Sequence, residues 1–151
     1  MGMETVMRLG FRRDPAAAWI DDYVAAWNAH DPVAVTDFMA SDVVYADFGL
    51  GEEYRGIDAV RDFVEGMELG FSSNYRFALE MAIVTDDAYA WEWTMTGIND
   101  GADEEHGFPA TGERFEIPGV SIGILRNGKI RENRDYWNMS TYLNQVGLAP
   151  E

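Results

Sequence analysis

The sequence predicts one domain of the α+β class. Two periodicities carry this prediction: the first part of the chain repeats apolar residues every three to four positions, as helices do, and most of the rest alternates them, as strands do. Helical segments therefore precede a long run of strands, which is typical of α+β proteins. The 151 residues, 47% of them hydrophobic, suffice for one well-buried core and are too few for two.

The first two helices begin in the same way. Asp14 is an N-cap followed by Pro15, and this helix is expected to end near His30; Asp31 and Pro32 repeat the signal for a second, shorter helix. Each has an apolar face at helical spacing, formed by Trp19, Ile20, Tyr23, Val24 and Trp27 in the first and by Val35, Phe38 and Met39 in the second.

Two further helices are expected over residues 58–67 and 140–146, the latter ended by Gly147. The acidic run 100–105 is interpreted as a solvated hairpin loop between two strands. Asn127-Gly128 is typical of a two-residue hairpin turn. Strands are indicated by β-forming residues with period-two alternation at 43–48, 75–84, 88–96, 113–125 and 129–138.

The charge balance excludes several classes of function. The chain has 27 Asp and Glu against 11 Lys and Arg, a formal net charge of −16, and would repel nucleic-acid backbones and anionic membranes. It has no cysteine, which excludes disulfides and thiolate chemistry. No apolar run is long enough to span a bilayer, and residues 1–13, an expected N-terminal extension, do not resemble a secretory signal. A cytoplasmic location is the default expectation.

Strand alternation places two aspartates beside aromatic residues. Tyr45 and Asp47 share one face of their strand, and Asp135 and Trp137 share one face of the last strand. A curved sheet over helices leaves room for a pocket lined by such side chains. Burial there would raise the pKa of a carboxylate toward neutrality, so that it could take a proton from a carbon next to a carbonyl.

Each carboxylate also has a structural interpretation. Asp47 can cap the turn that follows its strand, and Asp135 can form an ion pair with Arg131 or Arg134. Glu92, which stands between two tryptophans, can pair with an arginine across the sheet. These alternatives stay open at the level of the sequence.

Several short segments follow one another in a recognisable order: YVAAWNAHD at 23–31, DVVYADFG at 42–49, RGIDAV at 55–60, WEWTMTG at 91–97, PATG at 109–112 and GKIRENRDYW at 128–137. Together, from about residue 14 to 147, they resemble the SnoaL-like and ketosteroid-isomerase-like branch of the nuclear transport factor 2 superfamily. The resemblance implies a cone: a strongly bent, mostly antiparallel sheet wrapped around N-terminal helices, with one internal pocket, in a single domain over residues 14–148. It also implies a homodimer.

The resemblance also matches individual residues of this chain to functional residues of two enzyme families. Compared with ketosteroid isomerases, Tyr23 falls at the tyrosine that donates a hydrogen bond to a developing oxyanion, and Asp47 falls at the carboxylate base. Ser121 falls at the second oxyanion donor, an aspartic acid in that family. Compared with SnoaL-type polyketide cyclases, residues 135–138 resemble the region that holds the catalytic aspartate.

A comparison with limonene epoxide hydrolases supplies an alternative. Tyr45 falls at their water-positioning tyrosine and Asp135 at one aspartate of their Asp-Arg-Asp set, whose other two positions are Glu92 and Thr94 here. In that reaction Asp135 would activate a water held by Tyr45. A non-catalytic small-molecule-binding or dimerisation module is an alternative of a different class.

The leading hypothesis is cofactor-free and metal-free acid–base chemistry, either aldol cyclisation or isomerisation, on a mostly apolar or polycyclic small molecule that carries a carbonyl group. Asp47 and Asp135 would share the acid–base role, with Tyr23 or Tyr45 as hydrogen-bond donor. The residues expected to contact the substrate are Glu92, Thr94, Trp27, Trp137 and Ser121.

Overall fold

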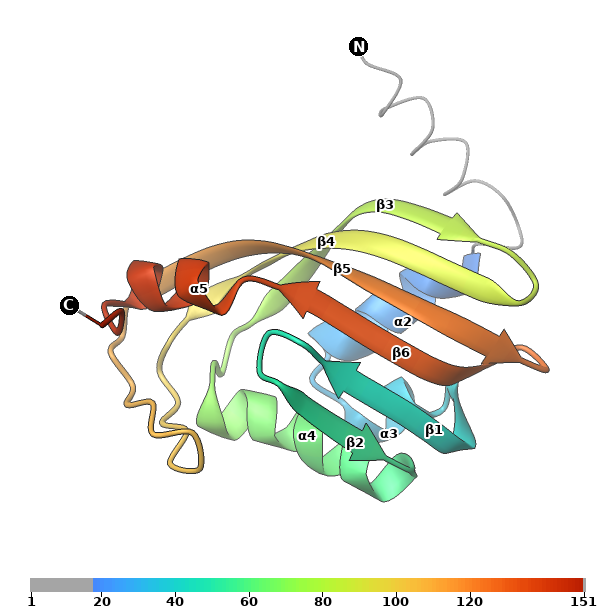
Figure 1. Ribbon diagram of the computed structural model, residues 1–151, viewed down its shortest axis with the longest axis horizontal. Coiled ribbons are helices and arrows are strands. Elements are labelled where there is room, and N and C mark those ends of the chain that lie inside the picture. Colours follow the sequence, from blue (N-terminus) through green and yellow to red (C-terminus); the bar gives the residue numbers. More distant parts are fainter. Residues whose placement is uncertain (1–17, 151) are drawn as a thin grey trace, which may run out of the picture.

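The computed structural model in Figure 1 describes residues 18–150. The expected extension over residues 1–13 and the start of the first helix at Asp14 lie outside the described residues. The described elements follow one another as α2 (Ala18–Asn28), α3 (Pro32–Thr36), β1 (Met39–Asp47), β2 (Glu52–Arg55), α4 (Ile57–Gly70), β3 (Arg76–Val84), β4 (Ala88–Ile98), β5 (Arg114–Arg126), β6 (Lys129–Trp137) and α5 (Met139–Val146).

Six strands form one bent sheet in the order β2-β1-β6-β5-β4-β3. Neighbouring strands are antiparallel except β1 and β6, which run parallel. The sheet curls over α2, which packs against β3, and over α4, which packs against β1 and β2 (Figure 1). The expected α+β cone is confirmed, and the curl directs one face of every long strand toward the interior.

The inner face carries the aromatic residues that the alternation predicts. On β4, Trp91 and Trp93 are buried, while Glu92 between them is exposed. Tyr23 of α2 meets Trp91 nearly edge-on, with 6.3 Å between ring centroids and an interplanar angle of 77°. Such pairs stabilise a core beyond the apolar area that they bury, so α2 is fixed against the sheet at the position where Tyr23 faces inward.

The structure differs from the expected elements between α2 and α4. The second helix ends at Thr36, and Phe38 and Met39, expected on its apolar face, lead instead into β1, where Met39 pairs with Ile130 of β6. β2 was not expected, because Tyr54 is its only apolar residue. Its pairing with β1 supplies the backbone hydrogen bonds that its own composition does not predict.

A bulge in β3 changes the expected face of that strand. The register against β4 shifts between Leu79 and Met81, so the inward and outward sides exchange there. Phe77, before the bulge, is buried, but beyond it Ala82 is buried and Ile83 is 38% exposed. The single apolar face expected along this strand is therefore interrupted.

The expected turn and stop signals are confirmed. Asn127 and Gly128 both have positive φ, 53° and 76°, as a type I′ hairpin turn between β5 and β6 requires. Gly147 ends α5 in the left-handed conformation, with φ 80°. Both positions tolerate this backbone because glycine and asparagine have the lowest cost at positive φ.

The outer face of the sheet exposes apolar side chains. Ile122 and Ile124 of β5 are 46% and 51% exposed, and Tyr136 of β6 is 41% exposed. The homodimer implied by the family resemblance would cover such a face, and it stays a prediction. None of the helices within residues 18–150 is long and apolar enough to cross a membrane.

Candidate active site

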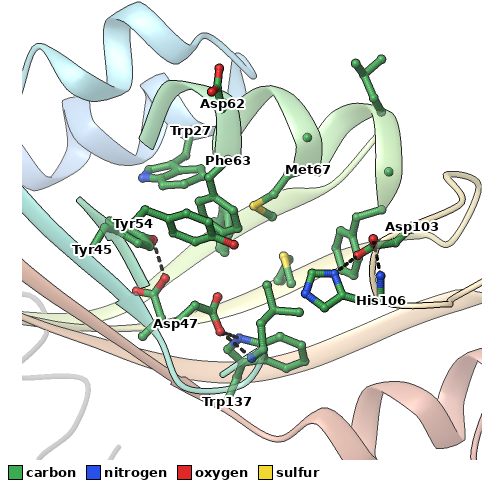
Figure 2. A pocket seen from close by; sticks show the side chains of 18 of the residues that line it. Trp27, Tyr45, Asp47, Tyr54, Asp62, Phe63, Met67, Asp103, His106 and Trp137 are labelled. Atoms are coloured by element: carbon green, nitrogen blue, oxygen red, sulfur yellow. Dashed lines mark hydrogen bonds and ion pairs between the residues drawn. The ribbon is translucent and has the colours of Figure 1, made fainter. Parts of the chain in front are cut away.

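A cavity of about 600 Å³ opens between the inner face of the sheet, α2 and α4. Its walls are mostly aromatic, and Figure 2 shows Trp27, Tyr45, Tyr54, Phe63 and Trp137 around it. Seven of the nine residues that the sequence singles out line this cavity: Tyr23, Trp27, Tyr45, Asp47, Ser121, Asp135 and Trp137.

Asp47 lies at the end of β1, where the chain turns toward β2. The Leu50 amide donates to its Oδ1 at 2.9 Å, and the Trp137 indole donates to the same oxygen at 2.9 Å (Figure 2). Asp47 is thus the turn cap that the structural interpretation expects and also a pocket residue, with only 6% of its surface exposed. Both of these bonds end on Oδ1, so Oδ2 keeps lone-pair capacity to accept a proton from a ligand, although the Gly49 amide also lowers the pKa of this carboxyl.

Asp135 lies on β6 and is register-paired with Asp47 on the parallel strand β1. Both of its oxygens accept hydrogen bonds from side chains. Ser121 Oγ and Asn133 Nδ2 donate to Oδ1 at 2.6 and 2.8 Å, and the Tyr45 hydroxyl donates to Oδ2. Among residues 18–150, Asp135 forms no ion pair, so the pairing with Arg131 or Arg134 is not observed; Arg134 contacts Glu132 instead, at 2.9 Å.

A second layer of donors fixes the groups around Asp135. The Trp93 indole donates to Ser121 Oγ at 3.0 Å, and the Tyr89 hydroxyl donates to Asn133 Oδ1 at 2.5 Å. These hydrogen bonds form two chains that both run toward Asp135. A carboxylate that accepts several such bonds is held in place and stabilised in its charged form.

Burial and mutual repulsion set the protonation of the pair. Burial, and next the charge of Asp135, raise the pKa of Asp47 to about 7, against the lowering effect of its own hydrogen bonds. Burial also raises the pKa of Asp135, while Ser121, Tyr45 and Asn133 oppose the rise. The two carboxylates titrate as one unit, and near neutral pH the charge is on Asp135, which accepts hydrogen bonds from three side chains.

Tyr23 offers a neutral donor on the α2 side. Its ring is 1% exposed, and burial raises its pKa above the ordinary tyrosine value, so that it keeps its proton. The Trp27 side chain, whose ring is in edge-on contact with Tyr23, lowers this pKa by less than burial raises it. The hydroxyl hydrogen of Tyr23 is then available to an acceptor in the cavity.

Glu92 and Thr94 do not belong to the cavity, and their expected substrate contact is corrected here. Both side chains lie on the outer face of β4, because they alternate with the buried Trp91 and Trp93. Glu92 is exposed, and Thr94 donates to Glu80 of β3 at 2.8 Å. The four-residue set of the epoxide hydrolase comparison is therefore not assembled. In addition, Tyr45 bonds directly to Asp135, so no water stands between them.

Sequence reasoning missed one wall of the cavity. The acidic run 100–105, expected to be a solvated loop, contributes Ala102, Asp103, Glu104 and Glu105 to the cavity rim, and His106 follows them. Local composition predicts an exposed loop there and carries no signal of where the loop folds back. Asn133 was also missed as a partner of Asp135, although its position on the same face, two residues earlier, was a usable signal.

The described residues hold no group of three or more His, Asp or Glu side chains arranged to bind a metal ion. Away from the acidic rim, the sequence-predicted polar groups that line the cavity include the carboxylates of Asp47 and Asp135, the hydroxyls of Tyr23, Tyr45 and Ser121, and the indole of Trp137. This set can move protons and stabilise an oxyanion.

Comparison with known proteins supports this reading of the fold. The family model of the SnoaL-like polyketide cyclases matches residues 17–146, whereas no protein of curated function matches the chain. Among solved structures, a candidate polyketide cyclase from Pseudomonas putida is 30% identical over 84% of this chain and 94% of its own, with a TM-score of 0.68. A candidate polyketide cyclase from Xanthomonas campestris is 27% identical over 89% and 98%, with a TM-score of 0.74.

A third structure extends the likeness to the ketosteroid isomerase-like fold. A hypothetical protein with that fold from Catenulispora acidiphila, solved in complex with trimethylamine, has a TM-score of 0.74 at 21% identity, over 87% of this chain and 92% of its own. This likeness concerns the fold alone. The family match covers most of the chain, so this protein belongs to the SnoaL-like polyketide cyclase family.

Proposed function

We propose that this protein is a cofactor-free acid–base catalyst that acts on a mostly apolar, carbonyl-bearing small molecule, by aldol cyclisation or double-bond isomerisation. The family match supports the general class of reaction. The single observation that carries the proposal is the state of Asp47: a carboxylate with one oxygen held and one oxygen toward an aromatic cavity, with its pKa raised to about 7.

In this reaction Asp47 Oδ2 removes a proton from a carbon next to the substrate carbonyl, and the electron pair moves to the carbonyl oxygen to give an enolate. Tyr23 donates a hydrogen bond to that oxygen as its charge develops. The enolate carbon then either attacks a second carbonyl of the same molecule, whose oxygen takes the proton from Asp47 as the C–C bond forms, or takes that proton back at another carbon, so that Asp47 is ionised again in both cases. A base with a pKa near the working pH is efficient in both directions of transfer.

Asp135 has a different task from the one that the sequence suggests. Its oxygens already accept bonds from Tyr45, Ser121 and Asn133, so it has little capacity to accept a proton from a ligand. We assign it the role of a fixed negative charge beside Asp47. That charge raises the pKa of Asp47 and so makes it a stronger base once it is ionised.

The test uses exchange of substrate protons with solvent, which requires only the first step. Polycyclic ketones that raise the melting temperature are incubated with the protein in D₂O, and deuterium at the carbon next to the carbonyl is measured by mass spectrometry. We expect Asp47→Asn to slow the exchange by about 10²- to 10⁴-fold. We also expect the rate of the wild type to increase with pH through about 7, as Asp47 ionises.

The matched control is Asp58→Asn, which removes an exposed carboxylate from the first turn of α4. It should leave the exchange rate unchanged. Full exchange by the Asp47→Asn protein would exclude Asp47 as the base. Incorporation of labelled oxygen from water into a product would indicate hydrolysis instead, because cyclisation and isomerisation add no oxygen.

A further inference from the structure

The rim of the cavity contains a small hairpin that is tied to the rest of the molecule at one point. Backbone hydrogen bonds of 2.8 Å in both directions join Asp103 and Phe108, and Gly107 makes the turn with φ 74°. His106 lies near its tip and stacks on the Phe108 ring, at 6.4 Å between centroids. Figure 2 shows Asp103 and His106 together at the side of the cavity. We call residues 102–108 the rim hairpin.

The base of the rim hairpin is fixed to the end of α4. The Gly101 amide donates to the Phe71 carbonyl at 3.2 Å, and the Ser73 amide donates to Asp100 at 2.8 Å. Gly101 also approaches the Phe71 backbone so closely that a Cβ there would lie 2.6 Å from the Phe71 nitrogen. If the rim hairpin moves, the backbone must therefore bend at residues that follow Gly101.

The tip is held by one side chain. His106 Nε2 lies 2.9 Å from Glu52 Oε1 on β2, and His106 Nδ1 lies 2.7 Å from Asp103 Oδ2. Within residues 18–150, the contact with Glu52 is the only hydrogen bond or ion pair between the rim hairpin and another part of the chain. This contact joins the rim hairpin to β2, the strand in which Glu52 pairs with Asp47 of β1.

This geometry requires a charged histidine. A neutral imidazole has one N–H donor and one lone pair, so it can donate to only one of two carboxylates, whereas imidazolium donates to both. From this we propose that His106, as imidazolium, is a positioning residue that ties the rim hairpin to Glu52 and thereby restricts the mouth of the cavity to ligands. The inference rests on the cavity being the ligand site, as proposed above, and not on its chemistry.

The surroundings of His106 favour the charged form. The Glu52 hydrogen bond has the largest effect and raises the pKa of His106; burial, the next largest, lowers it, and Asp103 raises it further. The other titratable groups on this side are Glu104 and Glu105 of the rim hairpin, Asp47 and Tyr54 of the β1–β2 hairpin, Asp62 of α4 and Tyr142 of α5. All of them are acidic or neutral, and no lysine or arginine within residues 18–150 lines the cavity.

The pH dependence follows from the direction of this shift. The hydrogen bond between His106 and Glu52 forms fully while His106 is protonated, below its raised pKa, and it is lost as the pH rises through that value. Loss of the proton leaves a lone pair opposite one carboxylate. Nδ1 stays near Asp103 because both belong to the rim hairpin, so the bond to Glu52 is the one released, and the mouth widens at higher pH.

The experiment measures access without turnover. The rate at which the neutral fluorescent dye Nile red binds is followed by stopped flow between pH 6 and 9. We expect the wild-type rate to rise by about three- to five-fold across this range, the effect of one partly exposed ion pair. Glu52→Gln, which keeps the shape but removes the charge, should bind the dye at the faster rate already at pH 6.

Two further variants sharpen the result. Glu53→Gln removes the same charge one residue along β2, where Glu53 is exposed and contacts Arg55 at 3.1 Å, and should behave as the wild type does. His106→Gln cannot carry a charge at this position and should lose the three- to five-fold rise in the rate of Nile red binding.

Histidine ring signals in NMR give an independent measurement, because the chain has only two histidines, and those of His30 report that the fold is intact. The pKa of His106 should fall in Glu52→Gln and remain unchanged in Glu53→Gln. Equal dye-binding rates and equal His106 titration in the wild type and Glu52→Gln would overturn the proposal, as would failure of every variant to bind the dye. Neither result depends on proton exchange by Asp47, so the two proposals fail separately.

Discussion

Asp47 and Asp135 occupy register-paired positions on neighbouring strands, and each is 6% exposed. Their hydrogen bonds differ. Asp135 accepts from side chains on both oxygens, and two of those donors are themselves held by a second layer. Asp47 accepts from Leu50 and Trp137 on one oxygen. Equal burial therefore produces a fixed charge on one strand and a proton acceptor on the next, because the number and direction of donors decide which carboxylate stays ionised.

The largest expected effect on stability comes from Asp135→Asn. The new amide group would point its own N–H atoms at groups that already donate, so at least one buried donor loses its acceptor. We expect the free energy of unfolding to fall by about 3 kcal/mol, measured by urea denaturation at pH 7. Asp37→Asn, at an exposed position after α3, is the control and should change little. Equal stability of the two variants would contradict the fixed-charge role.

Asp47→Asn should have the opposite effect. The folded-state pKa of Asp47, about 7, lies above its value of about 3.9 in the unfolded chain, so the folded state loses stability as the pH rises between these values. The shift corresponds to about 4 kcal/mol, of which we expect the neutral amide to recover about half at pH 8. At pH 4, where Asp47 is protonated, the variant and the wild type should be nearly equal. Thermal unfolding at both pH values checks the sign, and a variant less stable than the wild type at pH 8 would disprove it.

The smallest effect is expected from Glu92→Gln, although Glu92 is the third carboxylate that the sequence places among tryptophans. On the outer face of β4 its charge is already in water, so its removal should change the free energy of unfolding by less than about 0.5 kcal/mol. Proton exchange on ketones should also be unchanged. A large loss of exchange in this variant would mean that the inner and outer faces of the sheet are coupled in a way that the structure does not explain.

Much of the fold follows from patterns within single segments. The buried face of β4, the shared face of Asp135 and Trp137, and the turn at Asn127-Gly128 all depend on residues a few positions apart, and all are confirmed. β2 and the bulge in β3 were not predicted. Pairing with a neighbouring strand decides both, and a neighbouring strand leaves no mark on the local composition.

In the candidate site, too, local patterns predict some features, and contacts between distant segments decide the others. Aromatic residues at period two predict a cavity wall, and they carry Asp47 and Asp135 with them into the interior. The same period puts Glu92 and Thr94 on the face opposite Trp91 and Trp93, and the error came from the family comparison, which does not state which face of the strand each side chain occupies. The rim hairpin was missed since an acidic loop has the same composition whether it extends into solvent or folds over a pocket.

The sequence by itself determined the order of the helices and of the five longer strands, the buried face of β4, and the two aspartates that the strands carry inward. The tertiary structure alone decided that these aspartates become neighbours, that Tyr45 bonds to an aspartate 90 positions away, and that only one of the two carboxylates keeps an oxygen for a ligand. The physical reason is that periodicity acts over a few residues, whereas hydrogen-bond partners and shared burial depend on strand order and register, which bring distant segments together only in the folded chain.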